Sequence, residues 1–219
     1  ADVEAELQAR SRDSWLLHAA GRFLGQEQID FLLREAGRGG FRGTSEEVAI
    51  LFSDIRGFTA FSERLAPEDL VVFLNDYLGH MTRCIEYCDG RVDKFIGDAV
   101  MALFSLPRPR EDDAERAALA ALMMQAELER FNRKMPAGTP ELRIGVGLHL
   151  GPVVAGLIGS PQKRSYTVIG DAVNTASRLE GMTKQLGASI LVSSEIYQRF
   201  PDPERFWLRP LGRYCPKGR

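Results

Sequence analysis

The stretch VAILFSDIRGFT (residues 48–59) places an acid, Asp54, directly after an apolar run. An apolar run of this length that ends near a glycine predicts a buried β-strand. A buried carboxylate is costly unless something compensates its charge. Asp54 therefore needs hydrogen-bond donors, a cationic side chain or a metal ion at the end of this strand.

A second acid stands in the same situation in RVDKFIGDAVMALF (residues 91–104). Gly97 and Asp98 separate two apolar runs, which predicts a β-hairpin with the acid at its turn. Two neighbouring carboxylates repel each other unless divalent cations neutralise them, and Mg²⁺ accepts carboxylates together with substrate phosphates. Each acid alone is equally well explained by a cap on its own turn. The glycines beside them, Gly57 and Gly97, bare N–H groups for a phosphate and favour the metal.

Composition limits the kinds of partner that the chain can bind. The chain has 219 residues, of which 44% are hydrophobic and 26% charged, enough for one sizeable core and an appended segment. A net charge of -2 gives no basic surface for a nucleic-acid polymer. No run reaches the roughly 18 apolar residues of a membrane span, so we expect no membrane contact. Cys84, Cys88 and Cys215 are interpreted as reduced packing residues in a cytoplasmic protein.

The N-terminal part differs from the rest. Residues 1–45 have helical composition and end in a glycine-rich linker, and residues 46–219 form the expected main domain. The chain begins at Ala1 without a methionine and ends in CPKGR without a helix cap. We therefore expect a domain from a longer protein that also carries a regulatory domain and that could be tethered to a membrane.

Periodicity predicts an alternation of strands and helices. The order βαββαβ, followed by βαβ additions, predicts an α/β (α+β) fold with a ferredoxin-like core and a central sheet covered by helices. Asp112 and Glu115 have the spacing of a capping box. The expected elements are a strand at 48–53, a helix at 67–88, the hairpin at 91–104, a helix at 112–135, two strands around Gly151 and Pro152, a strand at 165–170, a helix at 171–182, a strand at 188–194 and a helix to Phe200.

Lys94 is unusual within the hairpin. Strict strand alternation places it with Val92 and Ile96 on the apolar side. An inward-facing lysine points to a ligand or an acid, although snorkelling from an edge strand is an alternative. The residues expected on the opposite side are Arg91, Asp93 and Phe95.

Asn174 and Arg178 lie four residues apart on a predicted helix and therefore share one face. An amide and a guanidinium side by side suit a ribose and a phosphoryl group. The alternative is an ordinary solvated helix face.

These residues carry a family resemblance. The segments VAILFSDIRGFTAFSE (48–63), DKFIGDAVMALF (93–104), GLHLGPVVAGLIGSPQKRSYTVIGDAVNTASRLE (147–180) and PLGRYCPKGR (210–219) resemble the catalytic domain of class III nucleotidyl cyclases, of the bacterial adenylate cyclase type. The likeness runs in order and at family spacing from about residue 46 to 219. Residues 1–45 resemble the helical segment that often precedes such domains.

The resemblance implies a role for each matching residue at the metal and triphosphate. Asp54 and Asp98 match the aspartates that bind two Mg²⁺ ions, for which Mn²⁺ can substitute, and the carbonyl of Ile55 matches a further ligand. Phe58 and Thr59 lie in the loop whose N–H groups hold the triphosphate. Two metals would align the 3′-hydroxyl for in-line attack on the α-phosphorus and neutralise the departing pyrophosphate.

The other matching residues concern the nucleoside. Lys94 and Thr167 match the pair that reads the purine. Asn174 and Arg178 match the pair that orients the ribose and stabilises the transition state, and Lys217 matches the lysine that holds the triphosphate. Family members form head-to-tail dimers with two composite sites, so a homodimer is expected.

Hydrogen-bond polarity favours ATP as the substrate. Adenine presents an acceptor at N1 and a donor at its amino group, which suit a lysine that donates and a threonine that can accept. Guanine would require an acid where Lys94 stands. Threonine at position 167 also resembles the bacterial branch in which bicarbonate stimulates activity, so bicarbonate activation is a further expectation.

The sequence leaves three alternatives. A guanylate cyclase conflicts with Lys94, and an inactive nucleotide-binding regulatory module would have lost one of Asp54, Asp98, Asn174 and Arg178. A diguanylate cyclase or polymerase palm shares the metal chemistry but does not explain the helix with Asn174. Two departures from the family pattern are Leu150, where a small hydroxylated residue is common, and a chain end two residues beyond Lys217, where relatives continue with a strand.

Overall fold

The computed structural model describes residues 43–106, 109–160 and 164–214. The chain divides into two compact units. The larger unit comprises Ser45–Val154 and Val168–Arg219, and the smaller comprises Ala1–Thr44 and Ala155–Thr167. The expected N-terminal helical segment, Cys215 and Lys217 lie outside the described residues.

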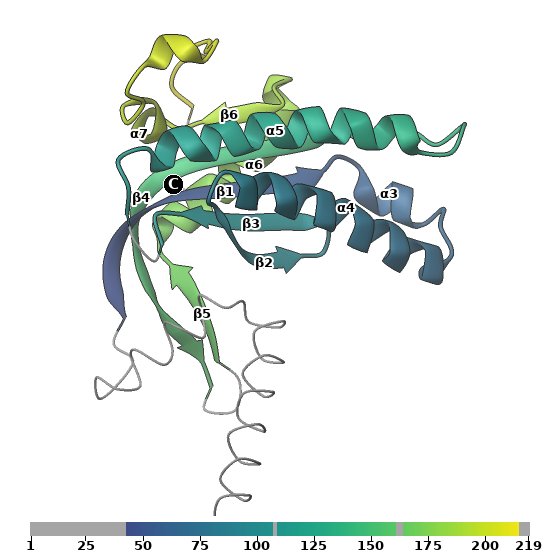
Figure 1. The fold of residues 1–219 in the computed structure, drawn as a ribbon, viewed down its shortest axis with the longest axis horizontal. Coiled ribbons are helices and arrows are strands. Elements are labelled where there is room, and N and C mark those ends of the chain that lie inside the picture. Colours follow the sequence, from purple (N-terminus) through teal and green to yellow (C-terminus); the bar gives the residue numbers. More distant parts are fainter. Residues whose placement is uncertain (1–42, 107–108, 161–163, 215–219) are drawn as a thin grey trace, which may run out of the picture. The chain divides into compact units, whose positions relative to one another are not determined.

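The described elements follow the expected alternation (Figure 1). In chain order they are β1 (Thr44–Ile55), α3 (Phe58–Ser62), α4 (Pro67–Tyr87), β2 (Arg91–Ile96), β3 (Ala99–Phe104), α5 (Asp113–Lys134), β4 (Ile144–Gly159), β5 (Arg164–Ile169), α6 (Asp171–Leu186), β6 (Ile190–Val192), α7 (Ser194–Tyr197) and the 3-10 turn η1 (Pro203–Arg205).

The strands form a sheet in the order β2-β3-β1-β4-β5, and β6 pairs with β4 in parallel. The segment from β1 to β4 has the element order βαββαβ, and its strands lie in the order β2-β3-β1-β4. This is the arrangement of the ferredoxin-like fold, so the predicted fold class is confirmed.

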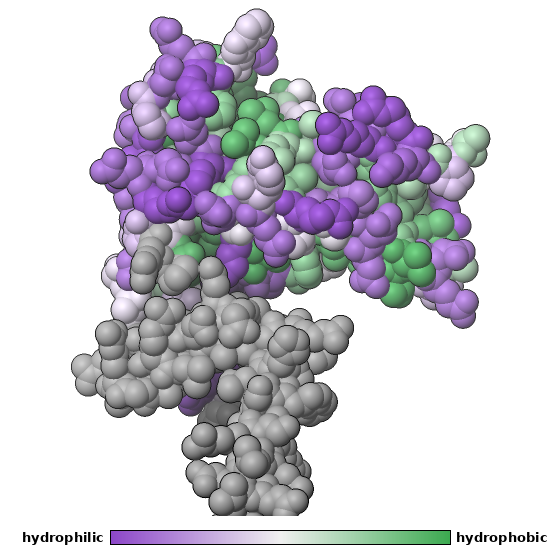
Figure 2. Space-filling view, in the orientation of Figure 1, coloured by the Kyte–Doolittle hydropathy of each residue, from purple (hydrophilic) through white to green (hydrophobic). Residues whose placement is uncertain are grey.

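One face of the sheet carries α4 and α5, which lie side by side (Figure 1). α4 begins with Pro67, and Glu68 and Asp69 lie in its first turn, where a fixed φ and negative charges suit a helix N-terminus. Figure 2 shows one face of the molecule, on which hydrophilic side chains surround patches of apolar side chains. The buried residues that join the two helices to the sheet include Leu51, Ala102, Phe104, Tyr77, Met81, Ile85, Ala117, Ala121 and Met124.

The opposite face of the sheet carries α6. Ile144, Val146 and Leu148 of β4 belong to the core under α4 and α5, so the alternating residues of β4 point the other way. Two of these are Gly145 and Gly147. A Cβ atom on Gly147 would lie 2.3 Å from the backbone nitrogen of Glu180 and 2.5 Å from the carbonyl oxygen of Ala176. The glycines therefore allow α6 to approach the backbone of β4.

Four local expectations were wrong. β4 is one strand that continues through Gly151 and Pro152, because the exposed Pro152 adopts extended backbone without interrupting it. Residues 58–62 form the short helix α3 instead of a loop, and β1 is longer than 48–53. Asp112 makes no side-chain cap, because its carboxylate pairs with Arg116 at 3.2 Å.

The predicted orientation of Lys94 relative to Val92 was also wrong. Val92 is opposite Ala102 and Lys94 is opposite Met101, so the pairing shifts by one residue at Asp93. Opposed residues of an antiparallel pair point to the same face, and a β-bulge interrupts strict alternation. Lys94 therefore shares a face with Met101, whereas Val92 points with Ala102 into the core under α4 and α5.

The structure also describes two of the cysteines and the apolarity of the helices. Cys84 and Cys88 are buried free thiols, as predicted for packing residues. Among the helices within residues 43–214 that the structure describes, none combines the length and apolarity needed to cross a bilayer.

Candidate active site

The two predicted metal-binding acids meet at Ile55. The backbone N–H of Ile55 donates a hydrogen bond to Oδ2 of Asp98 at 3.0 Å. The same N–H donates to Oδ1 of Asp54 at 3.1 Å. The structure therefore brings the two carboxylates together, although Asp54 and Asp98 are 44 residues apart in the sequence.

Strand register explains this convergence. Ser53 of β1 is opposite Val100 of β3. In an antiparallel pair, Ile55, two residues after Ser53, therefore lies level with Asp98, two residues before Val100. Gly97 has φ 66°, a left-handed conformation that glycine adopts without steric cost in a two-residue hairpin turn. The turn places the Asp98 side chain beside the end of β1.

The acid pair is electrostatically strained. The pKa of Asp98 is raised to about 7, first by burial and then by the hydrogen bond and negative charge of Asp54, while the N–H of Ile55 opposes the shift. Burial raises the pKa of Tyr77, and the charges of Asp98 and Asp54 act in the same direction. Two carboxylates held this close favour either a shared proton or a cation between them.

The donor set fits Mg²⁺. The pair offers two half-buried carboxylates in a position where a positive charge would relieve their repulsion. Within the described parts of the chain, no group of three His, Cys, Asp or Glu side chains is arranged to hold a metal. Mg²⁺ accepts a small protein donor set, since it is commonly bound by one or two carboxylates with water and substrate phosphates.

A third acid, Glu180 of α6, faces the pair and was not anticipated from the sequence. Its pKa is raised to about 7, first by burial and then by the charge of Asp54; the guanidinium of Arg56 opposes the shift and Asp98 adds to it. A Cβ atom on Gly145 would lie 2.5 Å from Oε1 of Glu180. The alternating glycines of β4 were the available signal, because they make room for this side chain.

Lys94 is held by its neighbour Asp93. The Nζ atom of Lys94 lies 3.2 Å from Oδ2 of Asp93, and the Nη2 atom of Arg91 lies 3.8 Å from Oδ1 of the same residue. The Asp93 side chain is 0% exposed, whereas the Lys94 side chain is 42% exposed. The expected acid partner of Lys94 exists, but strict alternation had placed it on the other face.

Asn174 and Arg178 lie on α6, as predicted. At about 100° per residue, they occupy the side of the helix opposite to Ala176 and Thr183. Ala176 and Thr183 are buried against β4, whereas Asn174 is exposed and Arg178 is half-buried. The structure therefore places this pair on the far side of α6 from Glu180, which faces the two aspartates.

The other predicted site residues that the structure describes lie on α3 and β5. Phe58 and Thr59 open α3 after Gly57, whose φ is 73°; Phe58 packs against the core and Thr59 is exposed. Thr167 is buried in β5 and belongs to the smaller unit.

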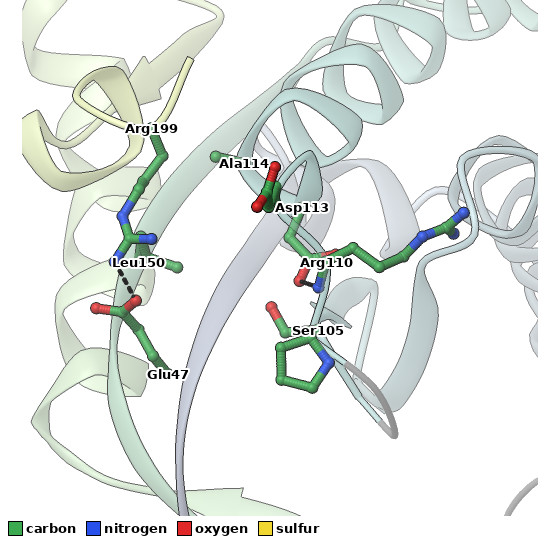
Figure 3. A pocket seen from close by; sticks show the side chains of 9 residues that line it. Glu47, Ser105, Arg110, Asp113, Ala114, Leu150 and Arg199 are labelled. Atoms are coloured by element: carbon green, nitrogen blue, oxygen red, sulfur yellow. Dashed lines mark hydrogen bonds and ion pairs between the residues drawn. The ribbon is translucent and has the colours of Figure 1, made fainter. Parts of the chain in front are cut away.

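A cavity of about 120 Å³ lies elsewhere in the larger unit, near the start of β1 and the end of β3 (Figure 3). Glu47 and Arg199 form an ion pair across one side of it, and Ser105 and the buried Asp113 line another. Leu150, which departs from the family pattern, forms part of its wall. None of the predicted site residues that the structure describes lines this cavity.

Comparison with known proteins identifies the family. Residues 42–219 match the adenylate and guanylate cyclase catalytic domain. The chain belongs to this family. An adenylate cyclase of Anabaena cylindrica is 43% identical over 175 residues, which cover 78% of this chain and 34% of that protein. The cyclase domain described here thus spans about a third of the length of the curated relatives it matches.

Solved structures of both nucleotide specificities resemble this cyclase domain. The guanylyl cyclase Cya2 is 36% identical with a TM-score of 0.67, covering 73% of this chain and 81% of that one. The adenylyl cyclase CyaB from P. aeruginosa is 34% identical with a TM-score of 0.66, covering 72% and 82%. Overall similarity therefore does not distinguish the purine base.

Proposed function

We propose that this cyclase domain is an adenylate cyclase, which converts ATP into 3′,5′-cyclic AMP and pyrophosphate. The observation that supports it most is the convergence of Asp54 and Asp98 on the N–H of Ile55, at 3.1 and 3.0 Å. A strained carboxylate pair is a ready cation site, and phosphoryl transfer depends mainly on positioning and charge neutralisation.

Asp54 and Asp98 would hold two Mg²⁺ ions, with the carbonyl of Ile55 as a further ligand and Mn²⁺ as a substitute. When bound, the metals would lower the pKa of the 3′-hydroxyl and neutralise charge on the phosphates. The 3′-oxygen forms a bond to the α-phosphorus as the bond from that phosphorus to the bridging oxygen breaks. Pyrophosphate leaves with this electron pair, and the hydroxyl proton goes to water or to a substrate phosphate.

The residues of the chain position and stabilise the reacting groups. The amide of Asn174 can orient the ribose, and the guanidinium of Arg178 can donate to the transferring phosphoryl group as its charge changes. Phe58 and Thr59 begin a helix, where the first N–H groups have no intrahelical partner and suit the triphosphate. Lys217 is proposed to bind the triphosphate as well.

The choice of ATP depends on Lys94. The solved relatives include both adenylyl and guanylyl cyclases, so the base preference must depend on the base-recognition residues. A lysine only donates hydrogen bonds, which matches N1 of adenine and not the N1–H of guanine. Thr167 would complete the recognition by accepting from the adenine amino group.

The geometry of α6 supports a homodimer with shared sites. Glu180 approaches the aspartates from the sheet side of α6, while Asn174 lies on its exposed side. One chain therefore presents its acids and its Asn174–Arg178 pair in different directions. A head-to-tail dimer would combine the acids of one subunit with Lys94, Asn174 and Arg178 of the other.

The test is nucleotide turnover by the purified domain. ATP and GTP are supplied separately with Mg²⁺ or Mn²⁺, and cyclic nucleotide and pyrophosphate are quantified. We expect equal amounts of cyclic AMP and pyrophosphate from ATP, little product from GTP, and stimulation by bicarbonate. Faster turnover of GTP would identify a guanylate cyclase, and nucleotide binding without turnover of either would indicate a regulatory module.

A further inference from the structure

We propose that Asp93 is a positioning residue for base recognition: it holds the Lys94 ammonium in place and thereby sets the preference for ATP over GTP. The proposal rests on the function proposed above, in which Lys94 contacts the purine. It adds a residue that would not touch the nucleotide.

The β-bulge in β2 creates the arrangement. The register shift between Val92 and Lys94 leaves Asp93 as the additional residue of the strand. In a regular strand, Asp93 and Lys94 would point to opposite faces. The bulge instead allows Oδ2 of Asp93 to lie 3.2 Å from Nζ of Lys94.

The ion pairs that Asp93 forms with Arg91 and Lys94 fix the position of the Lys94 ammonium. The Asp93 side chain is fully buried, so its carboxylate needs cationic partners. Arg91 lies on one side at 3.8 Å and Lys94 on the other at 3.2 Å. The Lys94 side chain is 42% exposed, so the ammonium is anchored by a buried acid and is still accessible from outside.

An anchored ammonium discriminates better than a mobile one. Lysine has a flexible four-carbon stem, and ordering it on binding reduces affinity. Contact with Asp93 orders the stem when the protein folds. An ammonium has three N–H donors, so a bond to Asp93 is compatible with donation to N1 of adenine. Loss of the contact should affect ATP, which accepts this bond, more than GTP, which does not.

The experiment compares kcat and KM for ATP and GTP in Asp93→Asn and in a matched control, Asp89→Asn. Asp89 also forms an ion pair, with Arg110 at 2.8 Å, and its φ of 54° is one that asparagine tolerates. Asp93→Asn should lower the ATP-to-GTP ratio of kcat/KM by about tenfold, mainly through the KM for ATP. Asp89→Asn should leave the ratio unchanged. An equal loss for both nucleotides would overturn the proposal and assign Asp93 a structural role.

A double variant tests whether Asp93 acts through Lys94. Lys94→Ala should lower the ATP-to-GTP ratio, and adding Asp93→Asn should lower it no further. A further fall would overturn the proposal. If Lys94→Ala leaves the ratio unchanged, the assignment of Lys94 to base recognition in the proposed function is wrong. If Lys94→Ala lowers the ratio and Asp93→Asn does not, the assignment of Lys94 stands and the positioning role of Asp93 is wrong. Should Asp93→Asn not fold, Asp93→Glu, which displaces the charge by one methylene, must still lower the ratio, and an unchanged ratio overturns the proposal.

Discussion

The N–H of Ile55 donates to Oδ2 of Asp98 across 43 residues of sequence, at 3.0 Å. This bond joins the end of β1 to the tip of the β2–β3 hairpin. It holds the Asp98 carboxylate beside Asp54, where burial and like charge raise its pKa. Backbone geometry therefore maintains a charge arrangement that the side chains alone would avoid.

Replacement of either aspartate should abolish most catalysis. Asp54→Asn or Asp98→Asn removes a charged ligand but preserves the shape and hydrogen-bond acceptor, so we expect turnover of ATP with Mg²⁺ to fall at least about a hundredfold. Steady-state assays of cyclic AMP measure this. Retention of more than about a tenth of the activity by either folded variant would contradict the two-metal assignment.

The same acid should make the metal-free protein less stable at neutral pH. The folded-state pKa of Asp98 is about 7 and its ordinary value is 3.8, so the folded state binds more protons between these values. The free energy of unfolding therefore falls as pH rises through this window. Relative to wild type, Asp98→Asn should become more stable from about pH 4 to pH 7 and should keep that advantage above it.

Urea denaturation in the presence of EDTA, at pH 4.5, 6 and 8 (roughly spanning the titration of Asp98), measures this difference. Added Mg²⁺ should reduce the advantage of the variant at pH 8, because the metal stabilises the charged pair. An advantage that is constant across the three pH values would show that Asp98 carries no raised pKa.

Lys94→Glu should change base preference. The carboxylate can accept from the N1–H and amino group of guanine, whereas it repels the acceptor at N1 of adenine. We expect ATP turnover to fall far more than GTP turnover, since an unpaired buried polar group penalises the wrong base. Competition between the two nucleotides in one assay gives the ratio directly, and an unchanged ratio in a folded variant would remove Lys94 from the base pocket.

Two inactive variants should complement each other. In a mixed dimer of Asp54→Asn and Arg178→Ala chains, both lesions fall in one composite site and the other site is intact. Activity should rise on mixing, toward about a quarter of the wild-type value at equal concentrations if subunits exchange freely and mixed dimers form half of the population. Native mass spectrometry establishes whether mixed dimers form. If they form and remain inactive, each subunit builds its own site.

Gly147 should be intolerant of a side chain. A Cβ atom there would lie 2.3 Å from the nitrogen of Glu180, and backbone contacts of this kind cannot be relieved by a rotamer change. Gly147→Ala should lower the free energy of unfolding by about 1–3 kcal/mol. The control is Gly181→Ala on the exposed side of α6, where no atom lies within 4 Å of the added Cβ atom. Alanine should stabilise the helix there by up to about 1 kcal/mol.

The sequence predicted the core of the fold because strong local signals coincide there. The apolar runs on either side of Gly97 required a hairpin, and the acid at its turn required a neighbour at the end of another strand. The helices at 67–88 and 112–135 were recognisable from their length and periodicity, and the structure places them at Pro67–Tyr87 and Asp113–Lys134. The register between β1 and β3 then brought Asp54 and Asp98 together.

Features that depend on packing between distant segments were not predictable. Strict alternation assigned Lys94 and Asp93 to opposite faces, because a bulge has no signal in a single strand and arises from pairing with β3. Glu180 looked like an ordinary helix residue, since only its contact with the glycines of β4 brings it toward the aspartates. The continuation of β4 through Pro152 was missed because proline usually ends a strand.

The bulge at Asp93 separates two requirements within one short strand. Lys94 lies opposite Met101, and the extra residue before it lets Val92 pair with Ala102 and face the core. A deletion of Asp93 would restore the period of two and leave Val92 and Lys94 on their present faces, because neighbouring residues of a regular strand alternate. The inserted residue is therefore not needed to direct the lysine, and what it adds is a buried carboxylate 3.2 Å from the lysine ammonium.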